Sequence, residues 1–229
     1  MSKISTKINF GNFFEDFSIG QKIVHPLPRT ISDGDVSLYI AFTGSRFALH
    51  SSDTIAKEMG YEKRPIDDML MFHLTFGKSV QDVSLNAIAN LGYAEMSFPN
   101  SVYVGDTVSM TSTVIGLKEN SNGKSGVVYV HSIGVNQNCE EVLNFKRWVM
   151  VHKKDQTTLS GINEVPTFAK TTPIADVINI PTIKTVDTDA SGGKYFFEDY
   201  VAGERLNHPE GITIDNSDHT LATKLYQNN

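Results

Sequence analysis

The feature that most constrains this chain is an internal repeat. Residues 13–46 align without a gap with residues 196–229, and 11 of the 34 aligned positions are identical. Unrelated sequences of average composition would share about two residues over this length. The identities begin with Phe-Phe-Glu-Asp in both copies and continue through a His-Pro pair and a Thr-Ile pair. A chain that starts the same unit twice is organised as a tandem of similar units.

Each copy of the repeat predicts an extended segment followed by a capped helix. In the first copy, residues 22–31 are extended and contain two prolines, which suits an edge or irregular strand. Ser32 and Asp35 then have the spacing of a capping box at the start of a helix. Asp215 and Asp218 repeat that spacing in the second copy. Capping gives Asp35 and Asp218 a structural role, so neither is favoured as a catalytic residue.

The second copy is too short to close a domain of its own. It reaches position 229 in or just after its helix, and the apolar faces of one strand and one helix need partners. We therefore expect residues 196–229 to be the opening strand and helix of a truncated second unit. The chain is then either a piece of a longer tandem protein or a variant in which this segment packs on the first unit.

Residues 1–153 predict one complete α+β unit. A stretch that is apolar nearly all round, residues 69–80, follows Pro65 and should form a helix buried on most faces. Alternating patterns then predict strands over roughly 89–98, 105–119, 125–137 and 141–153. This order indicates an antiparallel sheet wrapped round a long central helix. Residues 154–195 contain three prolines and little periodicity, so we expect a linker draped over the surface.

Composition excludes several classes of function. A net charge of −6 argues against general nucleic-acid binding, which needs a basic face. The single cysteine, Cys139, cannot form an internal disulfide and is typical of a reducing cytoplasm. The start of the chain is too polar for a signal peptide, and no apolar run is long enough to cross a membrane. We expect a cytoplasmic protein without membrane or nucleic-acid partners.

Several motifs of the first unit resemble those of the MaoC-like hydratase family. They are Phe14-Glu-Asp-Phe17, Thr30-Ile31 with Asp35, Phe42-Thr-Gly-Ser-Arg-Phe-Ala-Leu-His50, Pro65-Ile-Asp-Asp-Met69 and Val102-Tyr-Val-Gly-Asp-Thr-Val108. The resemblance covers about 13–153 and restarts at 196. Residues 43–53, 65–70 and 86–95 look closer still to the mesaconyl-CoA hydratase (β-methylmalyl-CoA dehydratase) branch, whose members are tandem double hot-dog proteins.

This resemblance implies a hot-dog fold and a hydro-lyase that adds water reversibly to an enoyl-CoA, in this branch mesaconyl-CoA. It implies no cofactor, because the CoA thioester is itself the substrate. It also implies that hot-dog units associate, so a homo-oligomer such as a dimer is expected. We expect no metal site, since His25, His73, His131 and His152 lack ligand spacing.

The resemblance also indicates where the chemistry should lie. Family members hold the attacking water between an aspartate and a histidine five residues apart, and the matching positions here are Ser45 and His50. A serine can orient water but cannot act as a base alone, so another carboxylate is needed. Asp53, Asp67 and Asp68 are the nearby candidates. Each also has a structural explanation, as an acidic residue stabilised at a helix N-terminus.

Three further roles follow from matching positions and charge. The family's oxyanion donor is a backbone N–H at the start of the buried helix, which corresponds to Met69 or, shifted by one residue, Asp68. Arg46, beside the site, could pair with the free carboxylate of mesaconyl-CoA or be an ordinary surface arginine. The catalytic candidates are thus His50, Ser45, Asp68 and Met69, and the substrate-binding candidates are Arg46, Asp53, Asp67, Lys118 and Lys124. The two lysines could meet CoA phosphates, although solvated turn lysines are the more common case.

Two other functions remain open from the sequence. The first is a different enzyme of the same fold, an R-specific enoyl-CoA hydratase or a thioesterase using Asp67 or Asp68. The second is a non-catalytic acyl-CoA-binding half or an inactive fragment, because Ser45 replaces the usual aspartate. The second copy has Asn228 at the carboxylate position, and its matching histidine would fall at 233, so a full second site is not expected.

Overall fold

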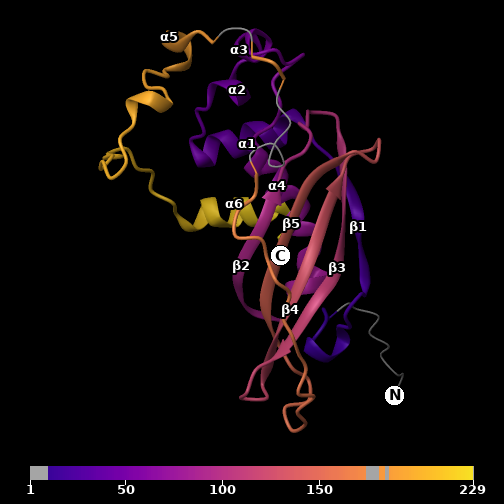
Figure 1. Ribbon diagram of the computed structural model, residues 1–229. Coiled ribbons are helices and arrows are strands. Elements are labelled where there is room, and N and C mark those ends of the chain that lie inside the picture. Colours follow the sequence, from indigo (N-terminus) through magenta and orange to yellow (C-terminus); the bar gives the residue numbers. More distant parts are fainter. Residues whose placement is uncertain (1–9, 174–180, 184–185, 229) are drawn as a thin grey trace.

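A curved antiparallel sheet wraps round one helix in the computed structural model, which describes residues 10–173, 181–183 and 186–228 (Figure 1). The strands lie in the order β1-β3-β4-β5-β2, and β6 extends the sheet by pairing with the end of β3. Their bounds are β1 Lys22–Thr30, β2 Ala87–Ser97, β3 Thr107–Glu119, β4 Ser125–Val135, β5 Glu141–His152 and β6 Asn163–Glu164. The four main predicted strands and the α+β hot-dog arrangement are confirmed.

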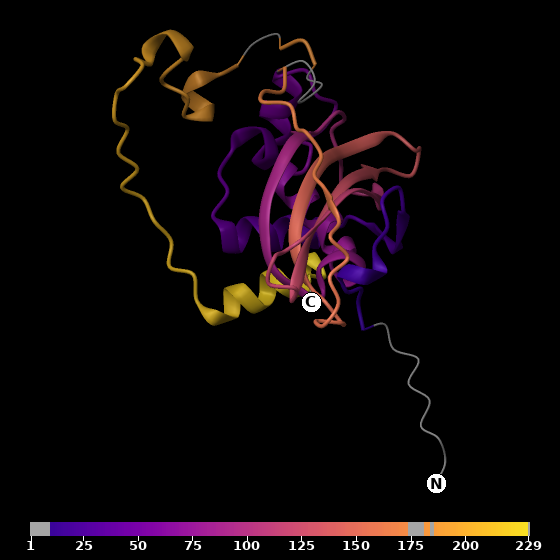
Figure 2. The same cartoon turned by 60° about the horizontal axis from the view of Figure 1, so that its bottom comes forward.

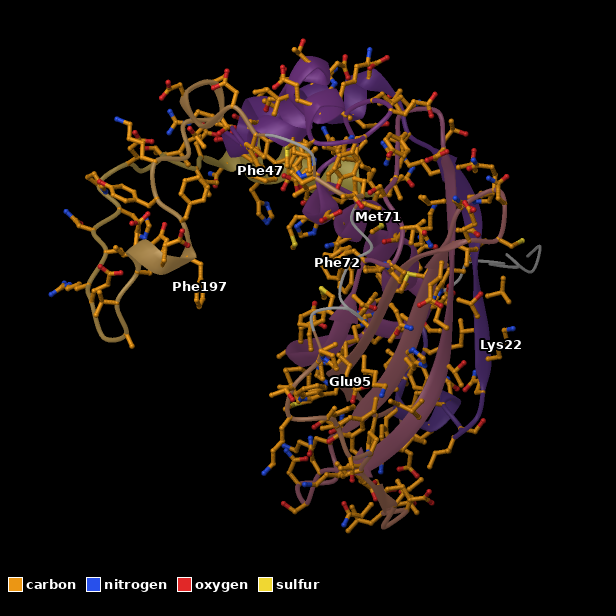
Figure 3. All side chains as sticks on the ribbon, turned by 45° about the horizontal axis from the view of Figure 1, so that its top comes forward. Lys22, Phe47, Met71, Phe72, Glu95 and Phe197 are labelled. Carbon is orange, nitrogen blue, oxygen red and sulfur yellow. The ribbon has the colours of Figure 1, made fainter. Side chains whose placement is uncertain are left out.

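The central helix is α4, Asp68–Phe76, and its side chains are buried on nearly every side. It continues as a 3₁₀ turn, η2 (Gly77–Ser79), and a π turn, η3 (Val80–Ser84). The predicted buried helix is therefore present but irregular in its second half. Met71 and Phe72 lie between this helix and the sheet (Figure 3).

Further helices gather at the end of the sheet where α4 begins (Figure 1). They are α1 Asp33–Thr43, α2 Ala48–Ser51 and α3 Asp53–Glu58. Helix α1 starts with the predicted capping box, in which Ser32 and Asp35 bond each other's backbone N–H. Asp35 also accepts a hydrogen bond from the Arg29 guanidinium, so its role is structural.

Two large apolar clusters lie against the sheet, and a row of polar side chains lies between them. A third, smaller cluster consists of Leu49, Ala56 and Tyr61. Along β3, Ser112 separates Met110 of the first cluster from Val114 of the second, and Arg147 does the same along β5. The polar row consists of His25, Ser79, Asp82, Ser112, Ser132 and Arg147.

Short hydrogen bonds join the polar row in two groups, one of four side chains and one of two. His25 Nδ1 lies 2.8 Å from Asp82 Oδ2, and its Nε2 lies 2.8 Å from Ser112 Oγ. Ser112 Oγ is 2.7 Å from Ser132 Oγ. Arg147 donates to Ser79 Oγ at 2.9 Å while its guanidinium lies over the Phe76 ring. Burial lowers the pKa of His25, although the hydrogen bond to Asp82 opposes the shift.

The linker and the second copy differ in how they meet the first unit. Phe168 of the segment after β5 stacks on Trp148 with ring centroids 5.0 Å apart, so this part lies against the sheet. The chain then loops away through α5 (Thr188–Ser191) and η5 (Phe197–Asp199) and returns with α6, Asn216–Tyr226 (Figure 2). The predicted capping box of α6, Asp215 with Asp218, is present.

The strand predicted for the second copy does not form. Residues 205–214 pair with no strand in the part of the chain that the structure describes. The equivalent strand β1 is held by β3, and residues 205–214 meet no such neighbour. Backbone pairing needs a partner strand, which the local pattern cannot supply.

Candidate active site

A carboxylate lies beside Ser45, that of Asp67 at the start of α4. Ser45 Oγ donates to Asp67 Oδ2 at 3.3 Å, and the Tyr39 hydroxyl donates to Asp67 Oδ1 at 3.3 Å. Asp67 is also the N-cap of α4 and accepts the Met69 amide at 2.8 Å. Three donors from α1, the following loop and α4 therefore fix this carboxylate beside Ser45.

His50 lies on α2 and is oriented by a backbone carbonyl. Its Nδ1 is 3.1 Å from the carbonyl oxygen of Pro65, which can only accept a hydrogen bond. The neutral ring is thereby held with its proton on Nδ1 and its lone pair on Nε2. The exposed Phe47 ring meets His50 edge-on, with centroids 5.2 Å apart, and Figure 3 marks its position. The site thus has an oriented imidazole beside an apolar surface.

Asp68 is the second carboxyl group at the start of α4. Burial raises the pKa of its carboxyl, the charge of Asp67 adds to the rise, and nearby His50 opposes it. Asp68 is half-buried, so it keeps a proton to higher pH than an exposed carboxyl. The interaction with His50 shows that these two titratable side chains lie near each other at the start of α4.

The other candidate residues are placed as follows. The Met69 amide is engaged by Asp67, as described above, and its side chain is partly exposed. Arg46 is exposed, and its guanidinium pairs with the Glu210 carboxylate of the second copy. Asp53 Oδ1 accepts a hydrogen bond from the Arg64 backbone N–H at 3.1 Å. This contact joins the start of α3 to the loop that follows it.

Lys118 and Lys124 lie at the opposite end of the sheet. They flank the turn from β3 to β4, whereas the candidate site lies where β3 begins, next to the end of β1. The twelve residues of strand from Thr107 to Lys118 span on the order of 35 Å at about 3.3 Å per residue. The structure does not bring these lysines together with His50.

Three residues near the site were not among the sequence candidates. Tyr39 donates to Asp67, and burial together with Asp67 raises the pKa of its hydroxyl. His73 lies further along α4, and burial lowers its pKa. Tyr226 of α6 stacks on His73 with centroids 4.4 Å apart. Burial of Tyr39 on α1 could have been inferred from its helical spacing, but the contact between His73 and Tyr226 joins distant segments and has no local signal.

Two negative findings apply to the described residues. No group of three or more His, Cys, Asp or Glu side chains is arranged there to hold a metal ion. None of the helices in those residues combines the length and apolar character needed to cross a bilayer.

Comparison with known proteins gives consistent results. The sequence profile of the mesaconyl-CoA hydratase family matches residues 1–190. The chain is 51% identical over 227 residues to the β-methylmalyl-CoA dehydratase of Chloroflexus aurantiacus, covering 98% of this chain and 64% of the relative. It is 46% identical over 224 residues to the mesaconyl-CoA hydratase of Cereibacter sphaeroides, covering 97% and 65%. The chain therefore spans just under two thirds of the length of these relatives.

Solved structures agree with the fold. A crystal structure of a MaoC domain protein dehydratase from Chloroflexus aurantiacus superposes with a TM-score of 0.92 and 52% identity, covering 98% of this chain and 64% of that one. A Mycobacterium tuberculosis protein described as a double hot-dog fold superposes with a TM-score of 0.65 at 22% identity, over 72% of this chain and 52% of that one. The second likeness concerns the fold alone.

Proposed function

The chain belongs to the mesaconyl-CoA hydratase family, and from that premise we propose that it adds water reversibly to an enoyl-CoA, converting mesaconyl-CoA to β-methylmalyl-CoA. The observation that carries this proposal is the Asp67 carboxylate at the Ser45 hydroxyl. It restores a carboxylate and a histidine to one site, where the aligned motif alone has only His50.

The proposed chemistry uses two proton-transfer groups. His50 Nε2 takes a proton from water, whose oxygen attacks the carbon β to the thioester carbonyl. The electron pair of the double bond moves toward the thioester oxygen, which the Asp68 backbone amide in the first turn of α4 stabilises, since the Met69 amide already donates to Asp67. Asp68, whose burial favours the protonated form, delivers a proton to the α carbon. Ser45 and Asp67 orient the water.

Arg46 is proposed to select the substrate's free carboxylate. Its guanidinium already reaches a carboxylate, that of Glu210, and both side chains are exposed, so this resting pair is weak and readily exchanged. Replacing Arg46 by leucine should reduce kcat/KM for mesaconyl-CoA at least tenfold more than for crotonyl-CoA, which lacks the carboxylate. Equal losses on both substrates would exclude this role.

The enzymatic proposal is tested by following the ultraviolet absorbance of the enoyl thioester. We expect His50→Ala to lower kcat for mesaconyl-CoA by about 10²–10⁴-fold, the usual contribution of a general base. Asp67→Asn should also reduce kcat, whereas the matched control His152→Ala, at the exposed end of β5, should not. Release of free CoA without hydration would favour a thioesterase, and binding without turnover would favour a non-catalytic acyl-CoA-binding half.

We also propose a cytoplasmic location and association of hot-dog units into oligomers. The edge strand β2 supports the second point, because Ile88, Leu91 and Tyr93 are exposed along it. Light scattering during size-exclusion chromatography measures the mass directly. A monomer at all concentrations would contradict self-association.

A further inference from the structure

The last turn of α6 packs on the first unit, whereas the segment before α6 is exposed. Leu225 and Tyr226 are buried, whereas residues 192–217 are exposed throughout. The second copy of the repeat therefore meets the first unit mainly through one end of one helix.

The first unit is shaped to receive this turn. A Cβ atom added at Gly77 would lie 1.9 Å from the carbonyl oxygen of Tyr226, so a larger residue at 77 would displace the helix. From β1, the Arg29 guanidinium donates to the carbonyl oxygen of Leu225. A cation at a helix C-terminus is favourable, because the last carbonyl groups carry partial negative charge.

Tyr226 connects this seat to the candidate site through a row of rings. Its ring stacks on His73 with centroids 4.4 Å apart and an interplanar angle of 19°. It also meets Phe42 edge-on at 6.1 Å, and Phe42 meets Tyr39 edge-on at 5.8 Å. Tyr39 in turn donates its hydroxyl to Asp67. Packed rings transmit displacement, since protein interiors leave little free space.

We propose that Tyr226 is a positioning residue for the site of the first unit, holding His73 and, through Phe42 and Tyr39, setting where the Asp67 carboxylate points. The second copy of the repeat thus helps to build the site of the first. This inference rests on the proposed function only for the role of Asp67 in hydration.

The packing around Tyr226 also affects the protonation of the side chains there. Burial lowers the pKa of His73, with Asp67 opposing, and raises the pKa of Tyr226 to about 12. Both side chains are therefore neutral at pH 7. The titratable and charged groups around this contact include Asp35 and Tyr39 on α1, Asp67, Asp68 and His73 at α4, Lys78 on η2, Tyr226 on α6 and Arg29 on β1.

The test compares two substitutions that keep or remove the ring. Tyr226→Phe keeps the stacking, so kcat for mesaconyl-CoA and the NMR titration of the His73 ring should stay close to wild type. Tyr226→Leu exposes His73 to water, so its pKa should rise toward the ordinary value of about 6.5. Misplacing Asp67 should then lower kcat about tenfold or more with little change in KM, and should shift the acid limb of the pH profile.

Two further variants sharpen the result. Gly77→Ala should displace the same turn and reproduce the effects of Tyr226→Leu. Tyr200→Leu removes an exposed ring from the same copy of the repeat and should change nothing.

Each outcome decides the inference. If Tyr226→Leu lowers stability but leaves the His73 titration and kcat unchanged, Tyr226 is merely structural and the inference is wrong. If the wild-type chain turns over no enoyl-CoA, the proposed function fails. The inference is then decided by NMR titration of His73, which should move in the leucine variant and not in the phenylalanine variant.

Discussion

The two copies of the repeat share a sequence pattern but have different surroundings. Phe14 is 4% exposed, and its equivalent Phe197 is 93% exposed. Ile31 is 1% exposed, and its equivalent Ile214 is 71% exposed. Both copies nevertheless form the same short 3₁₀ turn and the same capped helix.

The difference separates local from non-local causes of structure. Capping boxes and short turns are satisfied within a few residues, so they form in both copies. A strand and a buried core need segments from elsewhere in the chain. Within the described residues only the first copy has a partner strand, and the second copy reaches the core only through the end of α6.

The largest expected difference is in the free energy of unfolding when Phe14 or its equivalent Phe197 is replaced by alanine. Phe14→Ala should lower the free energy of unfolding by about 3–5 kcal/mol, since it empties a core site packed against Gly126. Phe197→Ala should change it by less than about 0.5 kcal/mol. Urea denaturation of the two variants measures both values. Similar losses would mean that the second copy has its own buried core.

A smaller difference is expected in the pH dependence of stability when His25 and His208, equivalent positions of the two copies, are replaced in turn. Burial lowers the pKa of folded His25, so below about pH 6.5 the unfolded chain takes up a proton that the folded chain excludes. This contribution to stability is complete above pH 6.5 and declines as the pH falls toward the folded pKa, by at most about 1.4 kcal/mol per pH unit.

Unfolding of three proteins between pH 5 and 8 tests this expectation. His25→Gln should flatten the decline seen in wild type, and His208→Gln, at an exposed position, should follow wild type. Parallel curves for wild type and His25→Gln would show that other groups cause the acid sensitivity.

The smallest contrast concerns the helix caps. Ser32→Ala should cost about 1 kcal/mol of global stability, because α1 belongs to the core unit. Asp215→Ala should instead promote local opening of α6, seen as faster amide hydrogen exchange there with an unchanged unfolding midpoint. An equal global loss for both variants would mean that α6 unfolds together with the first unit.

Much of the fold could be predicted because its signals are local. Alternation located the strands, apolar residues all round located α4, and the spacing of Ser32 and Asp35 located α1. The strand over 205–214 was predicted from the same kind of signal and was wrong, because pairing depends on a neighbour. A sequence pattern indicates which secondary structure a segment can form. Whether a strand forms depends on a neighbouring strand to pair with.

The site was predictable only in part. Aligned motifs led to Ser45 and His50, and nearness in sequence suggested three aspartates. Which of them reaches Ser45 depends on how α4 is placed against α1, and only the structure shows that it is Asp67. Likewise, 153 residues separate His73 from Tyr226, so no spacing rule could have paired them.

The polar row across the sheet has a consequence for strand register. Methyl groups and rings tolerate sliding past one another, whereas His25 must meet Asp82 on one side and Ser112 on the other at hydrogen-bond distance. If β1 slipped by two residues it would still present the same face, yet it would leave buried polar atoms without partners. The polar row therefore favours one register between β1 and β3. Its contribution is to the specificity of strand pairing more than to the stability of the sheet.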